Sequence, residues 1–483
     1  MKRLVYLLSL LLLSPFAFAI EHIPASVDFA DSLQLWDGFG FNYVETCQTR
    51  DYNEWEQDYG GYSLLNDKQK EEIAELVFGK NGLQVDIIKM FLDPWHQESP
   101  ESGFDHTTTT SNMLRFVEDG VSLARKENRE IEVITTLYGP PIWATLQGHI
   151  GGRDLDTSKF KDLAEYMIDW AKFLRERKIG VKYLSIHNEG EDFYRWTHDE
   201  GKQRLERFDY NAHWPPEQVN TFMKVLSKEV DRSGLNDLGV TNGEPSNWTR
   251  FHNWGYAHAL FSDKEAMAAL DLLTTHGFIN GDYTKLSYSN ANGSTTSMLR
   301  SERPDLHTWI TSYAWGALDT RFIKMAYEHI YYAGVNALIP WAGIQEPTQW
   351  LEGDSLGNAI TVTEDGEYKV TRGYYLYKQL TSAGHRGMKV ARTTAANPTA
   401  NLIGFSSNGT DHPDAFVLVS NIRIWGLPYA VEVKGSQYTR FRAYRTTEDG
   451  KDLYKDIGLF EVKDGRIVYD PPYGSVTTFI GQK

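Results

Sequence analysis

The chain has 483 residues, a formal net charge of −16, and an aromatic content of 14 Trp, 27 Tyr and 23 Phe. A chain of this length can bury a large core and divide into two domains. The negative charge argues against a nucleic-acid partner, because phosphate contacts need clustered lysines and arginines. Aromatic rings also stack on sugar rings, so their abundance gives weak support to a carbohydrate ligand.

The N-terminus has the pattern of a secretory signal peptide over residues 1–19. Lys2 and Arg3 come before an apolar stretch at residues 4–13, and Ala17-Phe18-Ala19 fits a cleavage site. The apolar stretch is too short to span a membrane, and no later segment reaches about 18 unbroken apolar residues. We therefore expect cleavage after Ala19 and a periplasmic or secreted protein without a membrane anchor.

Cys47 is the only cysteine. One thiol cannot form an internal disulfide, so the stability of the fold must come from its core. We interpret Cys47 as a partly buried small residue near the first strand, rather than as a nucleophile or a lipid attachment site.

Strands and helices alternate from residue 33 onward, which is typical of an α/β barrel. The predicted strands are 35–45, 85–93, 131–139, 181–190, 238–244, 271–278, 306–313 and 336–343. The clearest helices are 66–79, 112–128, 160–174, 217–234 and 320–334. Asn66 or Asp67 caps the first of these helices, and Asp156 or Thr157 caps the third. We predict a (β/α)8 TIM barrel over residues 33–375.

From about residue 380 the pattern changes to short alternating runs between Gly, Pro, Asn and Asp turns. This pattern predicts an antiparallel β-sandwich over residues 380–483. Residues 20–32 are candidates for a further strand of that domain. Because no low-complexity linker separates the two predicted domains, we expect them to pack rigidly against each other.

The active site of a (β/α)8 barrel is built from the carboxyl ends of the strands and the loops after them. In this chain those positions hold Glu45, Asp93, Trp95, His96, Tyr138, Trp143, Asn188, Glu189, Glu244, His276, Ser312, Tyr313, Trp315, Trp341 and Glu346. Carboxylates among aromatics suit cleavage of a glycosidic bond. One protonates the leaving oxygen, another acts as nucleophile or base, and the aromatics stack the sugar.

Three segments together resemble clan A glycoside hydrolases, and most closely family 30. YGPPIWATLQGHIGGRDL at 138–155 is similar to the family's Ser-Pro-Pro-x-Trp-Met loop with its Gly-Gly-x-Leu element. YLSIHNEGED at 183–192 resembles the Asn-Glu-Pro strand, and YDPPYGSVTTFIG at 469–481 resembles the family's C-terminal segment. The resemblance covers essentially the whole mature chain. It implies that Glu189 is the acid/base, that Asn188 binds the sugar 2-hydroxyl, and that Trp341 is a sugar platform.

The chain departs from the family pattern at two places. Asn-Glu-Pro reads Asn-Glu-Gly, which is a minor change. Where the family has Trp-x-Thr-Glu-Tyr, this chain has Trp309-Ile310-Thr311-Ser312-Tyr313, so a serine stands at the nucleophile's position. A serine hydroxyl needs activation and carries no charge to stabilise an oxocarbenium centre.

Several explanations of Ser312 remain open. Another carboxylate can reach the same space, with Glu346 as our first choice and Glu244 as the second. The mechanism could then be inverting, because a displaced base can leave the ~6.5–9.5 Å that a water needs. Alternatively the substrate supplies its own nucleophile, or the protein binds sugar without cleaving it. A Ser312–His276–carboxylate hydrolase is disfavoured because no G-x-S-x-G elbow surrounds the serine.

The strand-end histidines do not form a recognisable metal motif. His96, His187 and His276 lie near strand ends, but nothing resembles H-E-x-x-H. We interpret them as hydrogen-bonding groups, and we expect no metal or other cofactor.

The sequence predicts a secreted or periplasmic glycoside hydrolase that acts on a β-linked poly- or oligosaccharide, with an algal galactan as one candidate. The alternative is a carbohydrate-binding protein without activity on the same fold, suggested by Ser312. The choice of sugar and of endo or exo action depends on residues in the loops at 93–110, 191–213 and 280–300. The sequence does not select among these, nor does it indicate the oligomeric state.

Overall fold

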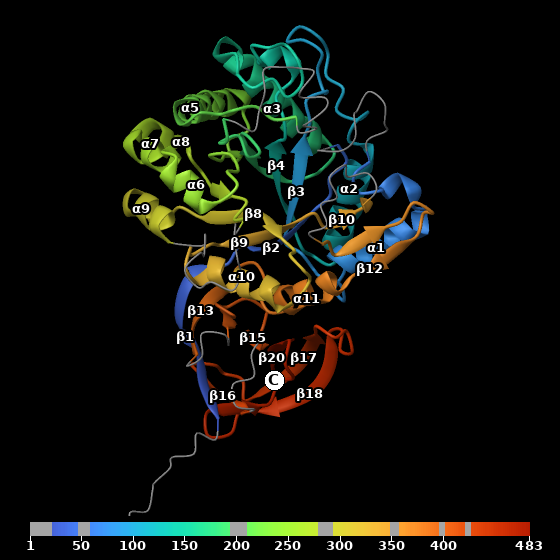
Figure 1. Cartoon of the computed structure of the whole chain (residues 1–483), viewed down its shortest axis with the longest axis vertical. Coiled ribbons are helices and arrows are strands. Elements are labelled where there is room, and N and C mark those ends of the chain that lie inside the picture. The colour runs from blue at the N-terminus through green and yellow to red at the C-terminus, as the bar shows by residue number, and fades with distance from the viewer. Residues whose placement is uncertain are drawn as a thin grey trace, which may run out of the picture.

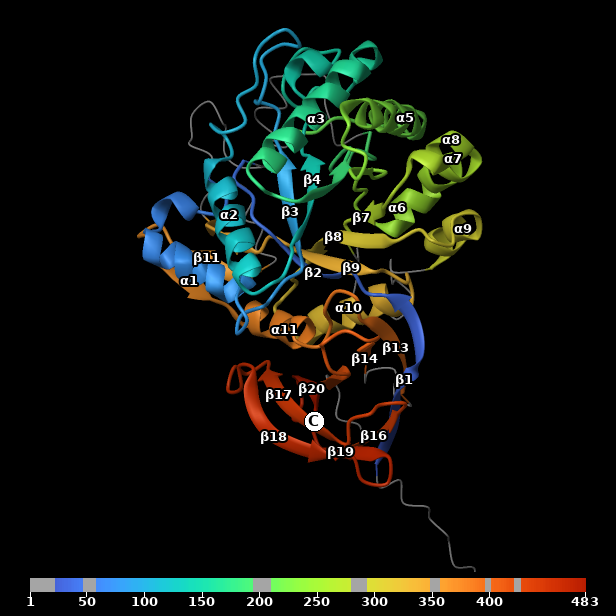
Figure 2. The same cartoon turned by 180° about the vertical axis from the view of Figure 1, so that it is seen from behind.

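The computed structural model describes residues 22–46, 58–193, 210–278, 293–347, 357–395, 401–420 and 427–483. The predicted signal peptide, Cys47, and most of the loops at 191–213 and 280–300 lie outside these residues. A helical upper region and a C-terminal sheet below it make up the molecule (Figures 1 and 2).

Within the described residues, eight parallel strands form one sheet at the centre of the upper region. They are β2 (Gly38–Asn42), β3 (Ile87–Leu92), β4 (Glu132–Leu137), β5 (Val181–Ser185), β6 (Gly239–Val240), β7 (Leu273–Thr275), β8 (Thr308–Ala314) and β9 (Ala337–Trp341). The sheet order is β6-β5-β4-β3-β2-β9-β8-β7, and a parallel bridge between Thr241 and Leu272 joins its two ends. The eight strands predicted from the sequence therefore form a closed parallel ring.

Buried side chains fill the inside of this ring. Ile87, Ile134, Leu272, Trp309 and Ile339 form one apolar cluster contributed by five strands. Such a layer makes the ring a packed core and leaves polar chemistry to its carboxyl end.

Helices surround the ring (Figure 1). They are α1 (Asp67–Phe78), α2 (Ser111–Lys126), α3 (Phe160–Glu176), α5 (Pro216–Ser233), α6 (Trp248–Asn253), α7 (Tyr256–Ser262), α8 (Lys264–Ala269), α9 (Ser294–Glu302), α10 (Thr320–Tyr331) and α11 (Arg372–Thr381). Short 3-10 helices occupy Tyr62–Leu64, Ile142–Ala144 and Thr157–Lys159. Asn66 forms a capping box with Gln69 at the start of α1, and the Asp156 side chain accepts from the Ser158 N–H just before α3. These caps satisfy backbone donors that a helix start leaves open.

Two further sheets complete the described part of the chain. A three-stranded sheet contains β10 (Ile344–Gln345), β11 (Ile360–Val362) and β12 (Tyr368–Val370). A nine-stranded sheet contains β1 (Ile23–Leu35), β13 (Lys389–Ala395), β14 (Leu402–Ser406), β15 (Ala415–Ser420), β16 (Tyr429–Lys434), β17 (Arg440–Thr447), β18 (Lys455–Glu461), β19 (Arg466–Tyr469) and β20 (Ser475–Gln482), as the described residues show.

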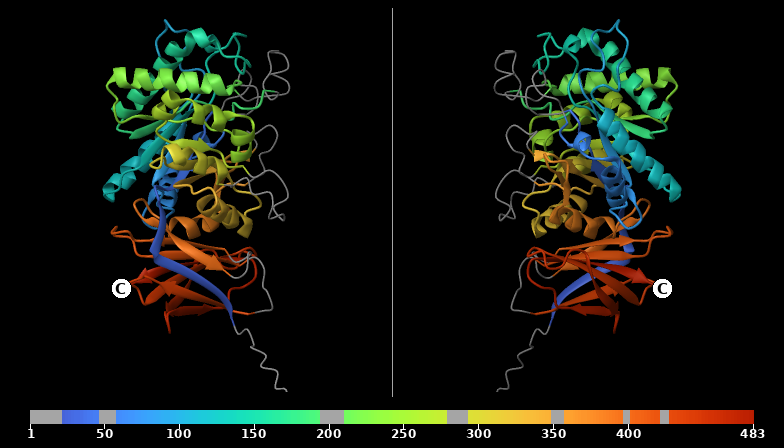
Figure 3. Two further views of the ribbon diagram at one scale, coloured as in Figure 1. Left: turned by 90° about the vertical axis from the view of Figure 1, so that its left-hand side faces the viewer. Right: turned by 90° about the vertical axis from the view of Figure 1, so that its right-hand side faces the viewer.

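The nine-stranded sheet has the order β18-β17-β20-β15-β14-β13-β1-β16-β19. Among its described pairings, only that of β1 with β16 is parallel; the others are antiparallel. Phe29 of β1 stacks against Phe441 of β17, with ring centroids 6.4 Å apart, although the two strands are distant in the sheet order. The sheet therefore folds over its own core, and β1 ties the start of the chain into it (Figure 3).

Helices α10 and α11 lie between the ring and the nine-stranded sheet and contact both (Figure 1). One hydrophobic cluster runs from Phe39 in the ring to Phe405 and Val476 in the sheet. The buried Gln379 of α11 donates to Thr446 Oγ1 at 2.9 Å and accepts from Thr478 Oγ1 at 2.6 Å. The junction is thus a packed and hydrogen-bonded core.

Gln379→Ala is expected to destabilise the whole protein by about 2–4 kcal/mol, because it leaves a cavity and two buried hydroxyls that lose a partner. Urea unfolding followed by fluorescence should show a single transition at a lower midpoint. Lys463→Ala, at an exposed surface ion pair, serves as the control and should change the midpoint little. Two separate transitions in the Gln379 variant would show that the junction does not couple the two regions.

Candidate active site

The carboxyl ends of β5, β6 and β7 bring four predicted residues together. Asn188 and Glu189 follow β5, Glu244 follows β6, and His276 follows β7. Asn188 forms a parallel bridge with Glu244, and the Glu189 N–H donates to the Glu244 carbonyl at 2.8 Å. Glu189 has φ 48°, a left-handed conformation that is strained for a residue with a side chain. The backbone therefore holds the Glu189 carboxyl group at a fixed place.

His276 lies between the two carboxyl groups. Its Nδ1 is 2.8 Å from Glu189 Oε1, and its Nε2 is 3.1 Å from Glu244 Oε2. All three side chains are buried or nearly so, with Glu189 at 9% exposure the most accessible. The imidazole thus links the predicted acid to a second carboxylate.

Glu244 has further partners at the base of this group. Lys89, from β3, forms a buried ion pair with Glu244 Oε2. Thr136, from β4, donates its hydroxyl to Glu244 Oε1 at 2.5 Å. Lys89 Nζ also donates to Ser312 Oγ at 3.1 Å. The Lys89 ammonium therefore contacts both Glu244 and Ser312.

These contacts determine the ionisation of Glu244, Lys89 and His276. Burial by itself raises the pKa of Glu244, but the Lys89 ammonium and the hydrogen bond from His276 outweigh it, so the pKa lies below the usual value. Burial lowers the pKa of Lys89, and the Glu244 charge opposes that shift. Burial lowers the pKa of His276 to about 4. Near neutral pH the group therefore holds an ionised Glu244 beside a neutral imidazole.

Aromatic rings adjoin this charged group. Lys89 Nζ lies 4.8 Å from the centroid of the Phe91 ring. Phe91 packs edge-on against Trp341 at 5.7 Å and Tyr138 at 5.6 Å between ring centroids. Trp341, with Trp95 and Trp143, is only partly buried. The half-buried indoles are therefore the rings available to a ligand.

Asp93 and His96 belong to a separate buried network. Asp93 Oδ2 accepts from Thr46 Oγ1 at 2.9 Å and lies 3.3 Å from His96 Nε2. His96 Nδ1 lies 2.8 Å from His106 Nδ1, and His106 Nε2 lies 3.0 Å from Asp169 Oδ1 on α3. This row of side chains runs from the end of β3 to α3. It positions the loop after β3.

Three predicted residues make contacts elsewhere. Glu45 accepts from the backbone N–H groups of Asn112 and Met113 at 2.8 and 2.9 Å, at the start of α2, which suits a carboxylate at a helix N-terminus. Tyr313 packs on Phe322 of α10 at 4.8 Å, and Trp315 stacks on the same ring at 5.0 Å. The pairing of β8 with β9 shifts between Ile310 and Tyr313, and such an irregularity changes which face a side chain occupies.

Glu346 follows β10. Its N–H donates to the Tyr59 carbonyl at 2.9 Å, and its Cβ would lie 2.7 Å from a Cβ added at Gly61. Tyr59 packs on Trp341 with centroids 6.0 Å apart. Glu346 therefore lies on the Trp341 side of the site.

Lys89 and Thr136 were not anticipated from the sequence. Both lie within predicted strands that consist mainly of apolar and β-branched residues. A lysine inside the run VDIIKMFLD at 85–93 was the available signal, because a buried ammonium needs a counterion.

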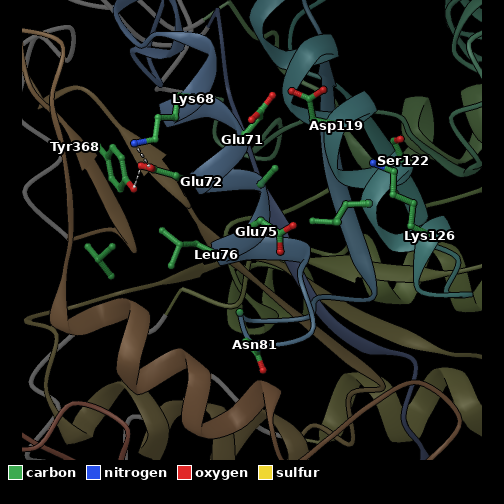
Figure 4. A pocket seen from close by; sticks show the side chains of 14 residues that line it. Lys68, Glu71, Glu72, Glu75, Leu76, Asn81, Asp119, Ser122, Lys126 and Tyr368 are labelled. Carbon is green, nitrogen blue, oxygen red and sulfur yellow. Dashed lines mark hydrogen bonds and ion pairs between the residues drawn. The ribbon is translucent and has the colours of Figure 1, made fainter.

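A groove of ≈ 970 Å³ lies elsewhere, on the outer surface between α1 and α2 (Figure 4). Glu71 and Glu75 of α1, Asp119 and Lys126 of α2, and Tyr368 of β12 line it. None of the predicted site residues contributes to this groove.

No group of three or more histidine, cysteine, aspartate or glutamate side chains among the described residues is arranged to hold a metal ion. A separate search of the same residues finds no helix that is long and apolar enough to cross a membrane.

The closed parallel ring joined to a large β-sheet is a fold that the chain shares with solved structures of family 30 glycoside hydrolases. A family 30 endoxylanase from Clostridium papyrosolvens C71 is similar over 95% of this chain and 100% of its own, with a TM-score of 0.68 and 15% identity. The family 30 xylanase C catalytic domain from Talaromyces cellulolyticus is similar over 95% and 100%, with a TM-score of 0.70 and 13% identity. A conserved exported protein from Bacteroides fragilis is similar over 94% and 99%, with a TM-score of 0.72 and 14% identity. No family profile and no curated protein matches the sequence.

Proposed function

We propose that the protein is a secreted or periplasmic glycoside hydrolase that cleaves β-linked glycosidic bonds in a poly- or oligosaccharide. The active site would lie in a (β/α)8 barrel over residues 33–375. A β-sandwich over 380–483, joined by a strand from 20–32, would support it. The observation that carries the proposal is the bridge from Glu189 through His276 to Glu244 at the carboxyl end of the ring.

Glu189 is the proposed general acid that protonates the leaving oxygen. It is the more exposed of the two bridged carboxyl groups, and its backbone is held in a strained conformation, as is common at active sites. Asn188 Oδ1 is buried, with no hydrogen-bond partner among the described residues. Such an acceptor suits a sugar 2-hydroxyl, because buried polar atoms are normally paired.

Glu244 is the proposed opposing carboxylate. It shares the Lys89 ammonium with Ser312, so it brings a negative charge close to the position where the family has its nucleophile. His276 separates the two carboxyl groups, with its Nδ1 2.8 Å from Glu189 Oε1 and its Nε2 3.1 Å from Glu244 Oε2, and an opposing carboxylate that does not contact the acid suits an inverting mechanism. Glu244 would then act as the base that activates water.

Two alternatives remain beside this assignment. Glu346, on the Trp341 side of the site, is the other candidate for the opposing carboxylate. The complete burial of Glu244, together with Ser312, favours the second candidate function, a carbohydrate-binding protein without turnover.

Reducing-sugar release from a panel of β-glycans tests the proposal. Xylan, β-1,6-glucan and algal galactans belong in the panel, because the fold and the sequence do not choose among them. We expect release from at least one substrate. Binding of a glycan with no release from any member would favour the binding protein.

Trp341→Ala is expected to raise KM about tenfold with a smaller change in kcat, because removing a stacking ring costs roughly 1.4 kcal/mol of sugar binding. Initial rates over a range of substrate concentrations separate the two constants. Tyr473→Ala removes an exposed ring on the C-terminal side of the molecule and should change neither. An unchanged KM in the Trp341 variant would remove Trp341 from the site.

A further inference from the structure

His276 has a carboxyl group at each ring nitrogen. A neutral imidazole has one N–H donor and one acceptor nitrogen, whereas an imidazolium has two donors. Two ionised carboxylates would therefore require a charged ring. A neutral ring instead requires that one of the two carboxyl groups carry a proton.

The Glu244 side of the bridge is fixed by its other partners. Lys89 has only N–H donors, and Thr136 directs its hydroxyl to Glu244 Oε1. An ion pair with an ammonium keeps Glu244 ionised and makes it an acceptor at both oxygens. The Nε2 of His276 must therefore carry the hydrogen that Glu244 accepts.

The surroundings favour a neutral ring. His276 is buried, and Lys89 places one positive charge close by, so a second cation would be costly. The ring also packs against Phe278, with centroids 5.1 Å apart.

Among the described residues, two other titratable groups interact electrostatically with His276, and both follow β5. They are Glu191 and His187. Glu191 Oε1 accepts from Arg250 Nη1 at 3.3 Å, which offsets its charge. Burial lowers the pKa of His187 to about 3, so it adds no charge near neutral pH.

We propose that His276 holds Glu189 in its protonated, acid form in the resting protein, and that Lys89 sets this state through Glu244. With the hydrogen on Nε2, the Nδ1 lone pair faces Glu189 Oε1 at 2.8 Å. Glu189 then donates its carboxyl proton to Nδ1. The inference rests on the proposed role of Glu189 as general acid; His276 and Lys89 are positioning residues.

Turnover uses this proton. Rotation of the Glu189 carboxyl group turns the O–H toward the glycosidic oxygen. The O–H bond of Glu189 breaks as the O–H bond of the leaving sugar forms, and Glu189 is left as a carboxylate. The attacking water gives one proton to Glu244 as its oxygen bonds to the sugar carbon. Solvent then carries that proton from Glu244 back to Glu189, which restores the resting state of the three groups.

Nitrogen-15 NMR of histidine-labelled protein tests the proposal without substrate. The spectrum of His276→Gln assigns the His276 signals among those of the 14 histidines. We expect a protonated Nε2 and an unprotonated Nδ1 between about pH 5 and 8. A ring protonated at both nitrogens, or at Nδ1 alone, would overturn the proposal even if the protein is an active glycosidase.

Lys89→Met tests the part played by the lysine. Without the ammonium, Glu244 should pair with a charged His276, and Glu189 should lose its proton to the ring. We expect both ring nitrogens to be protonated, and the alkaline limb of the kcat/KM profile to move to lower pH by about one unit or more. Lys89→Arg keeps the charge and should restore both readouts in part.

His252→Gln is the matched control, because His252 lies on α6 and bonds to Thr295. It should leave the pH profile and the His276 signals unchanged. If Lys89→Met leaves the tautomer unchanged, Lys89 does not set the state of Glu189. Absence of glycan cleavage by the wild-type protein would refute the proposed function, while the NMR result would still decide the protonation state.

Discussion

Glu189→Gln is expected to lower kcat/KM on an unactivated β-glycan by about 10²- to 10⁴-fold, because the variant cannot protonate the leaving oxygen. Glutamine keeps the size of the side chain, and its NH2 group can donate to Nδ1 of a neutral His276. The fold should therefore be unaffected. Initial rates of reducing-sugar release provide the measurement, and circular dichroism checks that the variant is folded.

The loss should depend on the leaving group. An aryl glycoside of the preferred sugar that releases a weakly basic phenolate needs little protonation, so Glu189→Gln should retain most of its activity on it. Unchanged activity of the variant on the natural glycan would contradict the assignment of Glu189 as the acid.

Glu244→Gln is expected to abolish turnover on both kinds of substrate and to destabilise the fold by about 3–5 kcal/mol. The turnover is lost because no base or charge remains opposite Glu189. The stability is lost because Lys89 is left as a buried, uncompensated cation. Denaturant unfolding and initial rates measure the two effects separately.

A double variant separates catalysis from stability. Lys89→Met combined with Glu244→Leu replaces the buried ion pair by apolar groups of similar size, which is often neutral or stabilising. We expect this protein to be more stable than Glu244→Gln, although Thr136 and His276 each lose an acceptor, and to remain inactive. Recovery of activity along with stability would mean that Glu244 serves only as the counterion of Lys89.

Glu346→Gln provides the direct comparison with the rival carboxylate. If Glu244 is the base, the Glu346 variant keeps turnover on activated and unactivated substrates. If Glu346→Gln is inactive while the stable double variant is active, Glu346 takes the opposing role. The configuration of the first product adds a second criterion, because a carboxylate that acts as a base on water gives inversion, whereas a nucleophilic carboxylate gives retention.

The strand pattern of the sequence predicted the ring well. The apolar runs that end in Glu189, Glu244 and His276 are strands β5, β6 and β7, whose ends meet as expected for parallel neighbours. The capping of α1 by Asn66 was also predictable, because it depends on residues close in sequence.

The partners of these side chains could not be predicted from the sequence. Glu45 stands at a strand end but is bound by the backbone of α2, more than 60 residues later. Tyr313 and Trp315 follow a register shift in the pairing of β8 with β9. No residue type in the sequence of β8 indicates that shift. Lys89 contacts Glu244 after β6 and Ser312 of β8 only in the folded ring, so its role as a counterion depends on tertiary structure.

The most direct test measures the activity of two variants relative to the wild type on two substrates, which gives four ratios. The variants are Glu189→Gln and the Lys89→Met/Glu244→Leu double variant. One substrate is the natural β-glycan, and the other is the activated aryl glycoside. We expect Glu189→Gln to lose about 10²- to 10⁴-fold of its activity on the glycan and to keep most of its activity on the aryl glycoside, while the double variant is inactive on both. Equal loss on both substrates for Glu189→Gln, near wild-type cleavage of the glycan by that variant, or turnover of either substrate by the double variant would contradict these roles.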